Sequence, residues 1–96
     1  MDETTQLYKQ HHELCDVIHS TYMQKNAAYG NSFSNTYKKL GIVSAVTRIT
    51  DKYNRLVALA TNSELDHGDE KITDTLLDMA NYCLMTVMEI ENNESN

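Results

Sequence analysis

Apolar residues recur with a helical period along most of the chain, and the longest such run lies between residues 70 and 91. At about 100° per residue, one stripe of this run is apolar and the opposite stripe is polar and acidic. We therefore predict a long amphipathic helix over residues 70–91. The predicted core stripe consists of Ile72, Leu76, Met79, Cys83, Val87 and Ile90, and the polar stripe of Glu70, Asp74, Asp78 and Asn81.

A second apolar edge, formed by Leu77, Leu84 and Met88, lies between these two stripes. It makes the helix apolar around more of its circumference than a surface helix of a small monomer needs. A chain of 96 residues also buries a small core by itself, because small domains have a high ratio of surface to volume. We therefore expect a homo-oligomer, at least a dimer, assembled through this edge.

The rest of the pattern predicts two more long helices and one short helix. The first helix begins at Thr4 or Thr5 as its cap and ends near residue 25, and a turn follows over residues 26–33. The short helix covers residues 34–40, with Ser34 as its cap, and stops at Gly41. The third long helix covers residues 42–60, and the polar segment 61–69 joins it to the last helix, which Gly68 and Asp69 cap. The residues predicted to be buried are Leu7, Leu14, Ile18 and Tyr22 in the first helix and Val43, Val46, Ile49, Thr50, Tyr53, Leu56 and Val57 in the third.

These elements predict an all-α fold, a helical bundle in a single domain over residues 1–96, with a frayed tail at 91–96. The formal charge of -6 disfavours a nucleic acid partner, because it repels a phosphate backbone. No stretch is apolar and long enough to span a bilayer, so we expect no membrane partner. Cys15 and Cys83 lack any partner at disulfide or metal-ligand spacing, and we interpret them as reduced core thiols of a cytoplasmic protein.

Two polar clusters are candidates for chemistry. On the third helix, Arg48, Lys52 and Arg55 share one stripe with Asp51, a pattern that suits either phosphate binding or a solvated face with internal ion pairs. On the first helix, His12, Asp16 and His19 have a spacing that a metal site could use, but an exposed helix face produces the same spacing, and we assign no metal there.

Three segments taken together resemble a known family: YGNSF at residues 29–33, RITDKYNRL at 48–56 and DTLLDMANY at 74–82. In this order the chain resembles the first nucleotide-modification-associated domain family, which comprises small phage and bacterial proteins. The resemblance covers about residues 25–89. It implies an all-helical protein with a nucleotide-related role, similar in architecture to the all-α MazG-like pyrophosphohydrolases.

In that larger group of enzymes, two acidic pairs on neighbouring helices hold Mg²⁺ against a triphosphate. Here the resemblance implies Asp74 and Asp78 as metal ligands, with Asp51 as the one acid on the third helix. The phosphate ligands that it implies are Arg48, Lys52 and Arg55. Contacts to the rest of the nucleotide are expected from Tyr29, Asn31, Ser32 and Asn81.

Three functions remain open at this point. The first is binding or sequestration of a phosphorylated nucleotide, in modified-nucleotide metabolism or against a nucleotide signal of host defence. The second is Mg²⁺-dependent hydrolysis of a nucleoside triphosphate, and the third is protein recognition without a ligand. We favour nucleotide binding, because one aspartate flanked by cations supplies fewer carboxylates than metal-assisted displacement requires.

Overall fold

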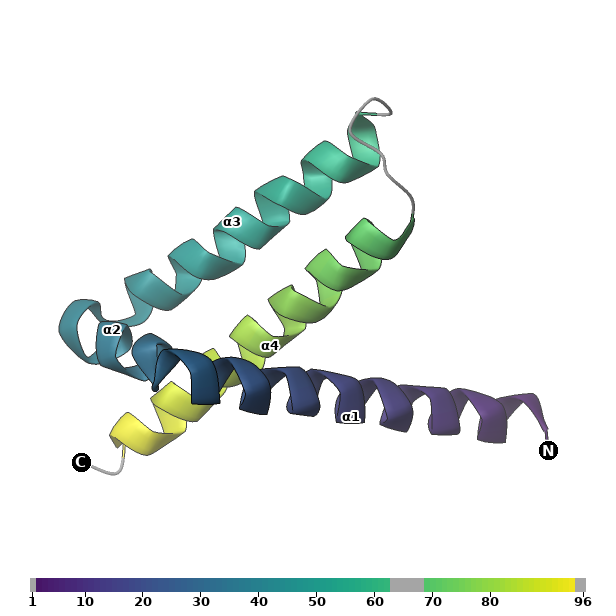
Figure 1. Cartoon of the computed structure of the whole chain (residues 1–96), viewed down its shortest axis with the longest axis horizontal. Helices are drawn as coiled ribbons and strands as arrows, with labels where there is room; N and C mark the ends of the chain where they lie inside the picture. The colour runs from purple at the N-terminus through teal and green to yellow at the C-terminus, as the bar shows by residue number, and fades with distance from the viewer. Residues whose placement is uncertain (1, 63–68, 95–96) are drawn as a thin grey trace. The chain divides into compact units, whose positions relative to one another are not determined.

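The computed structural model describes residues 2–62 and 69–94, and all regular structure in these residues is α-helical. The long helix α1 is followed by the short α2 and then by the long helices α3 and α4 (Figure 1). The predicted all-α fold of three long helices and one short helix is confirmed. In the described residues no helix has both the length and the apolar character needed to cross a bilayer. The bounds are α1 Glu3–Tyr29, α2 Ser32–Leu40, α3 Ile42–Thr61 and α4 Asp69–Glu94.

The chain divides into two compact units, Met1–Gly30 and Asn31–Asn96. The first unit contains α1, whose N-cap is Asp2 and not Thr4 or Thr5. The backbone N–H of Thr5 donates to Asp2 Oδ1 at 2.7 Å, and this hydrogen bond lowers the pKa of the Asp2 carboxyl below its ordinary value of 3.8. An aspartate is the better cap because its carboxylate accepts from free N–H groups of the first turn.

Helix α1 also continues four residues past its predicted end, to Tyr29. The segment predicted as a turn is mostly helical, because Ala27 and Ala28 favour helix and the left-handed residue that ends it is Gly30, with φ 59°. No side chain of α1 is buried. The prediction that Leu7 and Leu14 are buried is therefore wrong, and the exposed large apolar residues of this helix are Leu7, Tyr8, Leu14, Val17, Met23 and Tyr29.

The second unit begins with α2, whose N-cap is Asn31 and not Ser34. Asn31 has φ 56°, a left-handed conformation that asparagine tolerates better than most residues. Gly41 alone joins α2 to α3, and its N–H donates to the Tyr37 carbonyl at 2.7 Å. The Ser44 hydroxyl donates back to the Gly41 carbonyl at 2.8 Å, which holds the first turn of α3 against this joint.

Helices α3 and α4 lie side by side and antiparallel, and we call this pair the hairpin (Figure 1). Its apolar core is small. Among the described residues, the buried hydrophobic side chains are Ala45 and Leu59, both on α3, while Ile49 and Leu56 are half-buried between them. The predicted burial of Val43, Val46, Thr50, Tyr53 and Val57 is wrong. The stripe that these residues form on α3 points to one side of the helix and not toward α4.

Helix α4 runs to Glu94, so residues 91–94 of the predicted frayed tail are helical, and the polar segment 63–68 with its capping Gly68 lies outside the described residues. Half of the predicted core stripe of α4 is exposed, namely Leu76, Cys83 and Val87, and the rest is half-buried. Both thiols, Cys15 and Cys83, are exposed. On the second apolar edge of α4, Leu84 and Met88 are exposed and Leu77 is half-buried. Assembly through that edge stays a prediction.

Candidate functional site

The side of α4 that faces α3 is mainly polar. Its residues recur at intervals of three and four, so they form one continuous stripe along the helix. Within this stripe Thr75, Thr86 and Glu89 are buried, and the two threonine hydroxyls donate to the carbonyls of Lys71 and Tyr82 in their own helix. The stripe consists of Thr75, Asp78, Tyr82, Thr86 and Glu89. The two buried threonines therefore satisfy their hydroxyls within α4.

An ion pair between the two helices lies at the middle of this stripe. Lys52 Nζ of α3 is 3.4 Å from Asp78 Oδ2 of α4, and both side chains are about three-quarters buried, with exposures of 28% and 27%. Partial burial makes a pair of this kind stronger than a surface pair, since less water screens the two charges. The sequence placed both residues among the candidate ligands, and the structure brings these two together.

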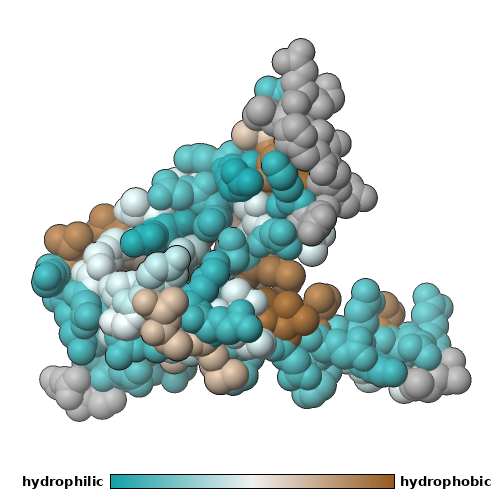
Figure 2. Space-filling model, in the orientation of Figure 1, coloured by the Kyte–Doolittle hydropathy of each residue, from teal (hydrophilic) through white to brown (hydrophobic). Residues whose placement is uncertain are grey.

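Arg48 and Arg55 lie one turn before and one turn after Lys52 on α3, and both are exposed. At 100° per residue they point about 60° to one side of the line between the helices, and Asp74 and Asn81 of α4 are turned to that same side. We call this surface, made by Arg48, Lys52, Arg55, Asp74, Asp78 and Asn81, the polar side of the hairpin. It faces the viewer in Figure 2, where α3 and α4 are mostly coloured as hydrophilic or near neutral.

The guanidinium groups on the polar side have no ion-pair partner among the described residues. The expected alternative, in which Asp51 binds Arg48 and Arg55, does not occur in this structure, although Asp51 is exposed on the same helix. Along about two turns of α3, two cations without an ion-pair partner in residues 2–62 and 69–94 therefore flank a paired one. Planar guanidinium groups bind phosphate oxygens with two parallel hydrogen bonds, so this arrangement is suited to a polyphosphate chain.

At the end of the hairpin beside α2, two contacts fix α2 against α4. The Ser34 hydroxyl donates to Glu89 Oε1 at 2.9 Å, and Glu89 is only 8% exposed. The rings of Phe33 and Tyr82 stack with centroids 5.9 Å apart and an angle of 30° between their planes. Tyr82 follows Asn81 directly, so this contact ties the start of α2 to the residue next to the polar side.

The sequence analysis missed Tyr82 and Glu89 as contact residues. Tyr82 belongs to the segment DTLLDMANY, so that segment already pointed to it. The contact of Ser34 with Glu89 joins residues 55 positions apart, and no local pattern in the chain indicates it.

The other predicted nucleotide contacts lie around the joint between the two units. Tyr29 is the last residue of α1 and is exposed, while Asn31 and Ser32 begin the second unit and are also exposed. Their role in nucleotide binding stays a prediction.

The carboxylates proposed as metal ligands do not form a group in the described residues. Asp51 and Asp74 are exposed on different helices, and Asp78 is occupied by Lys52. On α1, His12 Nε2 is 3.8 Å from Asp16 Oδ2, and both side chains are largely exposed. Nowhere in the described ranges do three His, Cys, Asp or Glu side chains meet in a way that could hold a metal ion. The described residues therefore do not bring together the acids that the resemblance implies as Mg²⁺ ligands, and an Mg²⁺ site stays a prediction.

Comparisons with known proteins bear on these observations. No curated protein and no solved structure matches the chain. The match to a family spans residues 25–90, which includes α2, α3 and all but the last turn of α4. It therefore contains every residue of the polar side and both contacts between α2 and α4. The chain belongs to the family described as nucleotide modification associated domain 1.

Proposed function

We propose that this protein binds a phosphorylated nucleotide on the polar side of the hairpin without a metal ion. The observation that carries the proposal is the row of cations on α3: Lys52, paired with Asp78 at 3.4 Å, lies between Arg48 and Arg55, which have no ion-pair partner in the part of the chain that the structure describes. Arg and Lys side chains are long enough for three cations at successive turns to converge on the oxygens of one phosphate chain. The family description supports a role connected with nucleotides.

In this arrangement each group has a distinct task. Arg48 and Arg55 bind phosphate oxygens and, because they are exposed, they reach a ligand without breaking another ion pair. Asp78 holds the Lys52 ammonium in place, so the central cation is positioned before the ligand arrives. Asp74 on the facing helix is exposed and accepts hydrogen bonds from the sugar or base, and Asn81 lies on the same side of that helix.

The proposed role is sequestration or presentation of the nucleotide, either in the metabolism of modified nucleotides or by removing a nucleotide signal of host defence. Hydrolysis of the MazG-like type requires carboxylates gathered around a divalent ion, and the described acids are not gathered in that way. A panel of nucleotides identifies which base the ligand has and how many phosphates it carries.

The test is isothermal titration of the full chain with a panel of nucleoside mono-, di- and triphosphates and cyclic nucleotides, with Mg²⁺ and with EDTA. We expect binding that persists in EDTA, with the ligand recovered intact by chromatography. Arg48→Ala is expected to weaken binding at least about tenfold, which corresponds to roughly 1.4 kcal/mol for one charged hydrogen-bonding partner. Circular dichroism checks that the variant keeps its helices.

Lys39→Ala is the matched control, because it removes one positive charge from an exposed position on α2 and leaves the polar side unchanged. It is expected to change affinity less than twofold, roughly the loss that long-range screening allows. An equal loss in both variants would show that net charge, and not this site, governs binding. Release of a monophosphate and pyrophosphate that requires Mg²⁺ would establish the enzyme instead.

A further inference from the structure

The two ends of the cation row on the polar side differ in what lies beside them. Arg48 precedes Lys52 by four residues and Tyr82 follows Asp78 by four residues, so each step is about one helical turn, or roughly 6 Å along the axis. Both steps run in the same direction, because α3 and α4 are antiparallel and Lys52 pairs with Asp78 (Figure 1). Tyr82 therefore lies level with Arg48, at the end of the row beside α2.

An aromatic surface is present at this end of the row. The ring of Tyr82 stacks on the ring of Phe33 with centroids 5.9 Å apart, and we call these two residues the aromatic pair. Both residues are half-buried. The aromatic pair therefore packs α2 against α4 and still reaches the surface with part of its area.

A second contact holds the aromatic pair in place. Ser34 follows Phe33 directly, and its hydroxyl donates to Glu89 Oε1 at 2.9 Å. Glu89 lies seven residues after Tyr82, about two turns further along α4, and is only 8% exposed. The start of α2 is therefore fixed to α4 at two levels before a ligand arrives. A surface that is fixed in advance loses less conformational entropy when it binds.

The other end of the cation row is polar. Arg55 lies about one turn beyond Lys52 in the opposite direction, where the level positions of α4 are Asp74 and Thr75. Asp74 presents an exposed carboxylate, and the hydroxyl of the buried Thr75 donates within its own helix. The row is therefore asymmetric, with aromatic rings at one end and polar groups at the other.

A nucleotide has the same asymmetry as this row. Its base is flat and aromatic, whereas its phosphates are anionic and extend from the sugar in one direction. Aromatic side chains stack on any base, because every base has a π face, and guanidinium groups bind phosphate oxygens. The order aromatic pair, Arg48, Lys52 and Arg55 along the hairpin therefore matches the order of base, first phosphate and later phosphates.

We propose that the base of the nucleotide stacks on the aromatic pair, with the first phosphate on Arg48 and any further phosphates extending toward Arg55. This orientation rests on the proposed function, since it takes the polar side as the nucleotide site. It restricts the ligand class to phosphates that carry an aromatic base, in contrast to sugar phosphates and inorganic polyphosphate. It also fixes the direction in which the ligand lies along the hairpin.

The first test compares ligands with and without a base by isothermal titration of the full chain. The probes are ATP, GTP, CTP and dTTP, with inorganic tripolyphosphate as the probe that has no base. Phe33→Leu is expected to weaken the best-bound nucleotide about fivefold or more, the lower end of the loss expected when base stacking is removed. The same variant is expected to bind tripolyphosphate within about twofold of the unmodified chain, because that ligand does not reach the aromatic pair. Phe33→Tyr keeps an aromatic ring and is expected to recover most of the affinity that Phe33→Leu loses.

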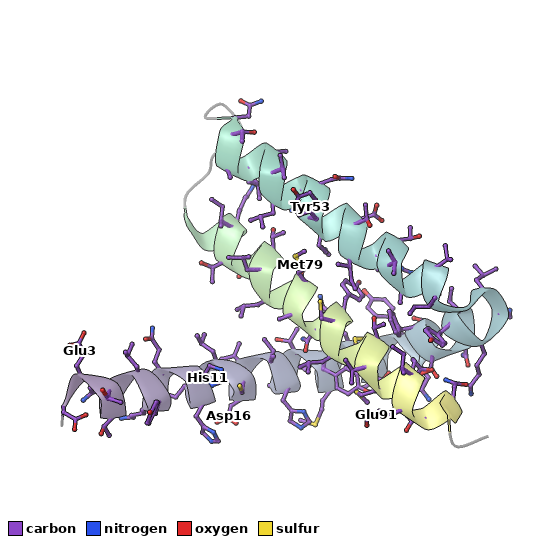
Figure 3. The ribbon with its side chains drawn as sticks, turned by 180° about the vertical axis from the view of Figure 1, so that it is seen from behind. Glu3, His11, Asp16, Tyr53, Met79 and Glu91 are labelled. Atoms are coloured by element: carbon purple, nitrogen blue, oxygen red, sulfur yellow. The ribbon has the colours of Figure 1, made fainter. Side chains whose placement is uncertain are left out.

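Tyr53→Leu is the matched control for the loss of an aromatic ring. Tyr53 is labelled on α3 in Figure 3 and is 54% exposed. It follows Arg48 by five residues and so points about 140° away from it around the helix, on the stripe that α3 exposes outside the polar side. The control is expected to change nucleotide affinity less than about twofold. An equal loss in Phe33→Leu and Tyr53→Leu would overturn the stacking.

The second test leaves the aromatic pair unchanged, so it holds even if Phe33→Leu fails to fold. It compares each triphosphate with the matching monophosphate in Arg48→Ala and Arg55→Ala. Arg48→Ala is expected to weaken both ligands by similar factors, since both place their first phosphate there. Arg55→Ala is expected to weaken the triphosphate at least about threefold more than the monophosphate.

The outcomes separate the orientation from the proposed function. Nucleotide binding that Arg48→Ala weakens and Phe33→Leu leaves intact would overturn the orientation and keep the polar side as the binding site. A monophosphate that depends more on Arg55 than on Arg48 would do the same, because the base would then lie at the other end. Absence of binding for every nucleotide probe, or binding that Arg48→Ala does not change, would overturn both.

Discussion

At the scale of single residues, the ion pair between Lys52 and Asp78 is expected to contribute measurably to stability. It is about three-quarters buried and joins residues of two helices, so removal of one partner leaves a charge with little access to water. We predict that Lys52→Met or Asp78→Asn lowers the free energy of unfolding by about 1–2 kcal/mol, between the values of exposed and fully buried pairs. Urea unfolding followed by circular dichroism measures this change.

An exposed ion pair on α1 provides a reference for the strength of the Lys52–Asp78 pair. Lys9 and Glu13 on α1 form a pair at 4.0 Å in which both side chains are more than 60% exposed. A double-mutant cycle on this exposed pair is expected to give a coupling energy of no more than about 0.5 kcal/mol. Equal coupling energies for the two pairs would contradict the view that burial strengthens the contact between α3 and α4.

The residues of the candidate site could be predicted only in part from the sequence. Periodicity places Arg48, Lys52 and Arg55 on one stripe, because that depends only on the helix repeat. It does not give the register of one helix against another, so the pairing of Lys52 with Asp78 was not predicted and is known only from the structure. The contact of Ser34 with Glu89 depends on tertiary packing alone.

At the scale of elements, the two glycine joints of the chain make different demands on the backbone. Gly30 has φ 59° and ψ 61°, a left-handed conformation that other residues adopt at a cost of about 1 kcal/mol. Gly41 has φ 75° and ψ -165°, a region populated almost only by glycine, where another residue costs roughly 1–3 kcal/mol. A Cβ atom would meet nothing within 4 Å at either position, so backbone conformation alone decides the difference.

We therefore predict that Gly41→Ala lowers the melting temperature more than Gly30→Ala does, by calorimetry of the two variants side by side. For a domain of this size a loss of 1 kcal/mol corresponds to about 4–8 °C. The reverse order would mean that the joint between α2 and α3 relaxes into another conformation.

The elements themselves were largely predictable, whereas the faces that they bury were not. Glycines and the helical period located all four helices, and errors at the ends arose where Asp2 and Asn31 cap helices in place of Thr4 or Thr5 and Ser34. The apolar stripes of α3 and α4 were identified correctly as stripes, but the structure turns polar residues of α4 toward α3. An apolar stripe indicates that a helix packs against something, and does not indicate which surface it packs against.

At the scale of the whole molecule, the hairpin separates the proposed ligand site from the exposed apolar stripe of α3. Arg48 lies on the polar side and Val46 lies in this exposed stripe, although two positions separate them in the sequence. We predict that Val46→Glu keeps the nucleotide affinity per chain within about twofold, since the two surfaces share no residue. Isothermal titration of the folded Val46→Glu variant tests this, and a loss of affinity as large as that of Arg48→Ala would contradict it.

The opposite orientation of these two surfaces also limits how the gene can change. Each residue inserted into α3 rotates everything after it by about 100°, so one added codon before position 55 would move Arg55 from the polar side toward α4 and Val57 from the exposed apolar stripe of α3 toward the polar side. Substitutions can alter either surface separately, whereas a change of length within α3 alters both at once. Related genes are therefore expected to differ in length in the segments that flank α3 and α4 and to keep the interior of α3 free of insertions and deletions.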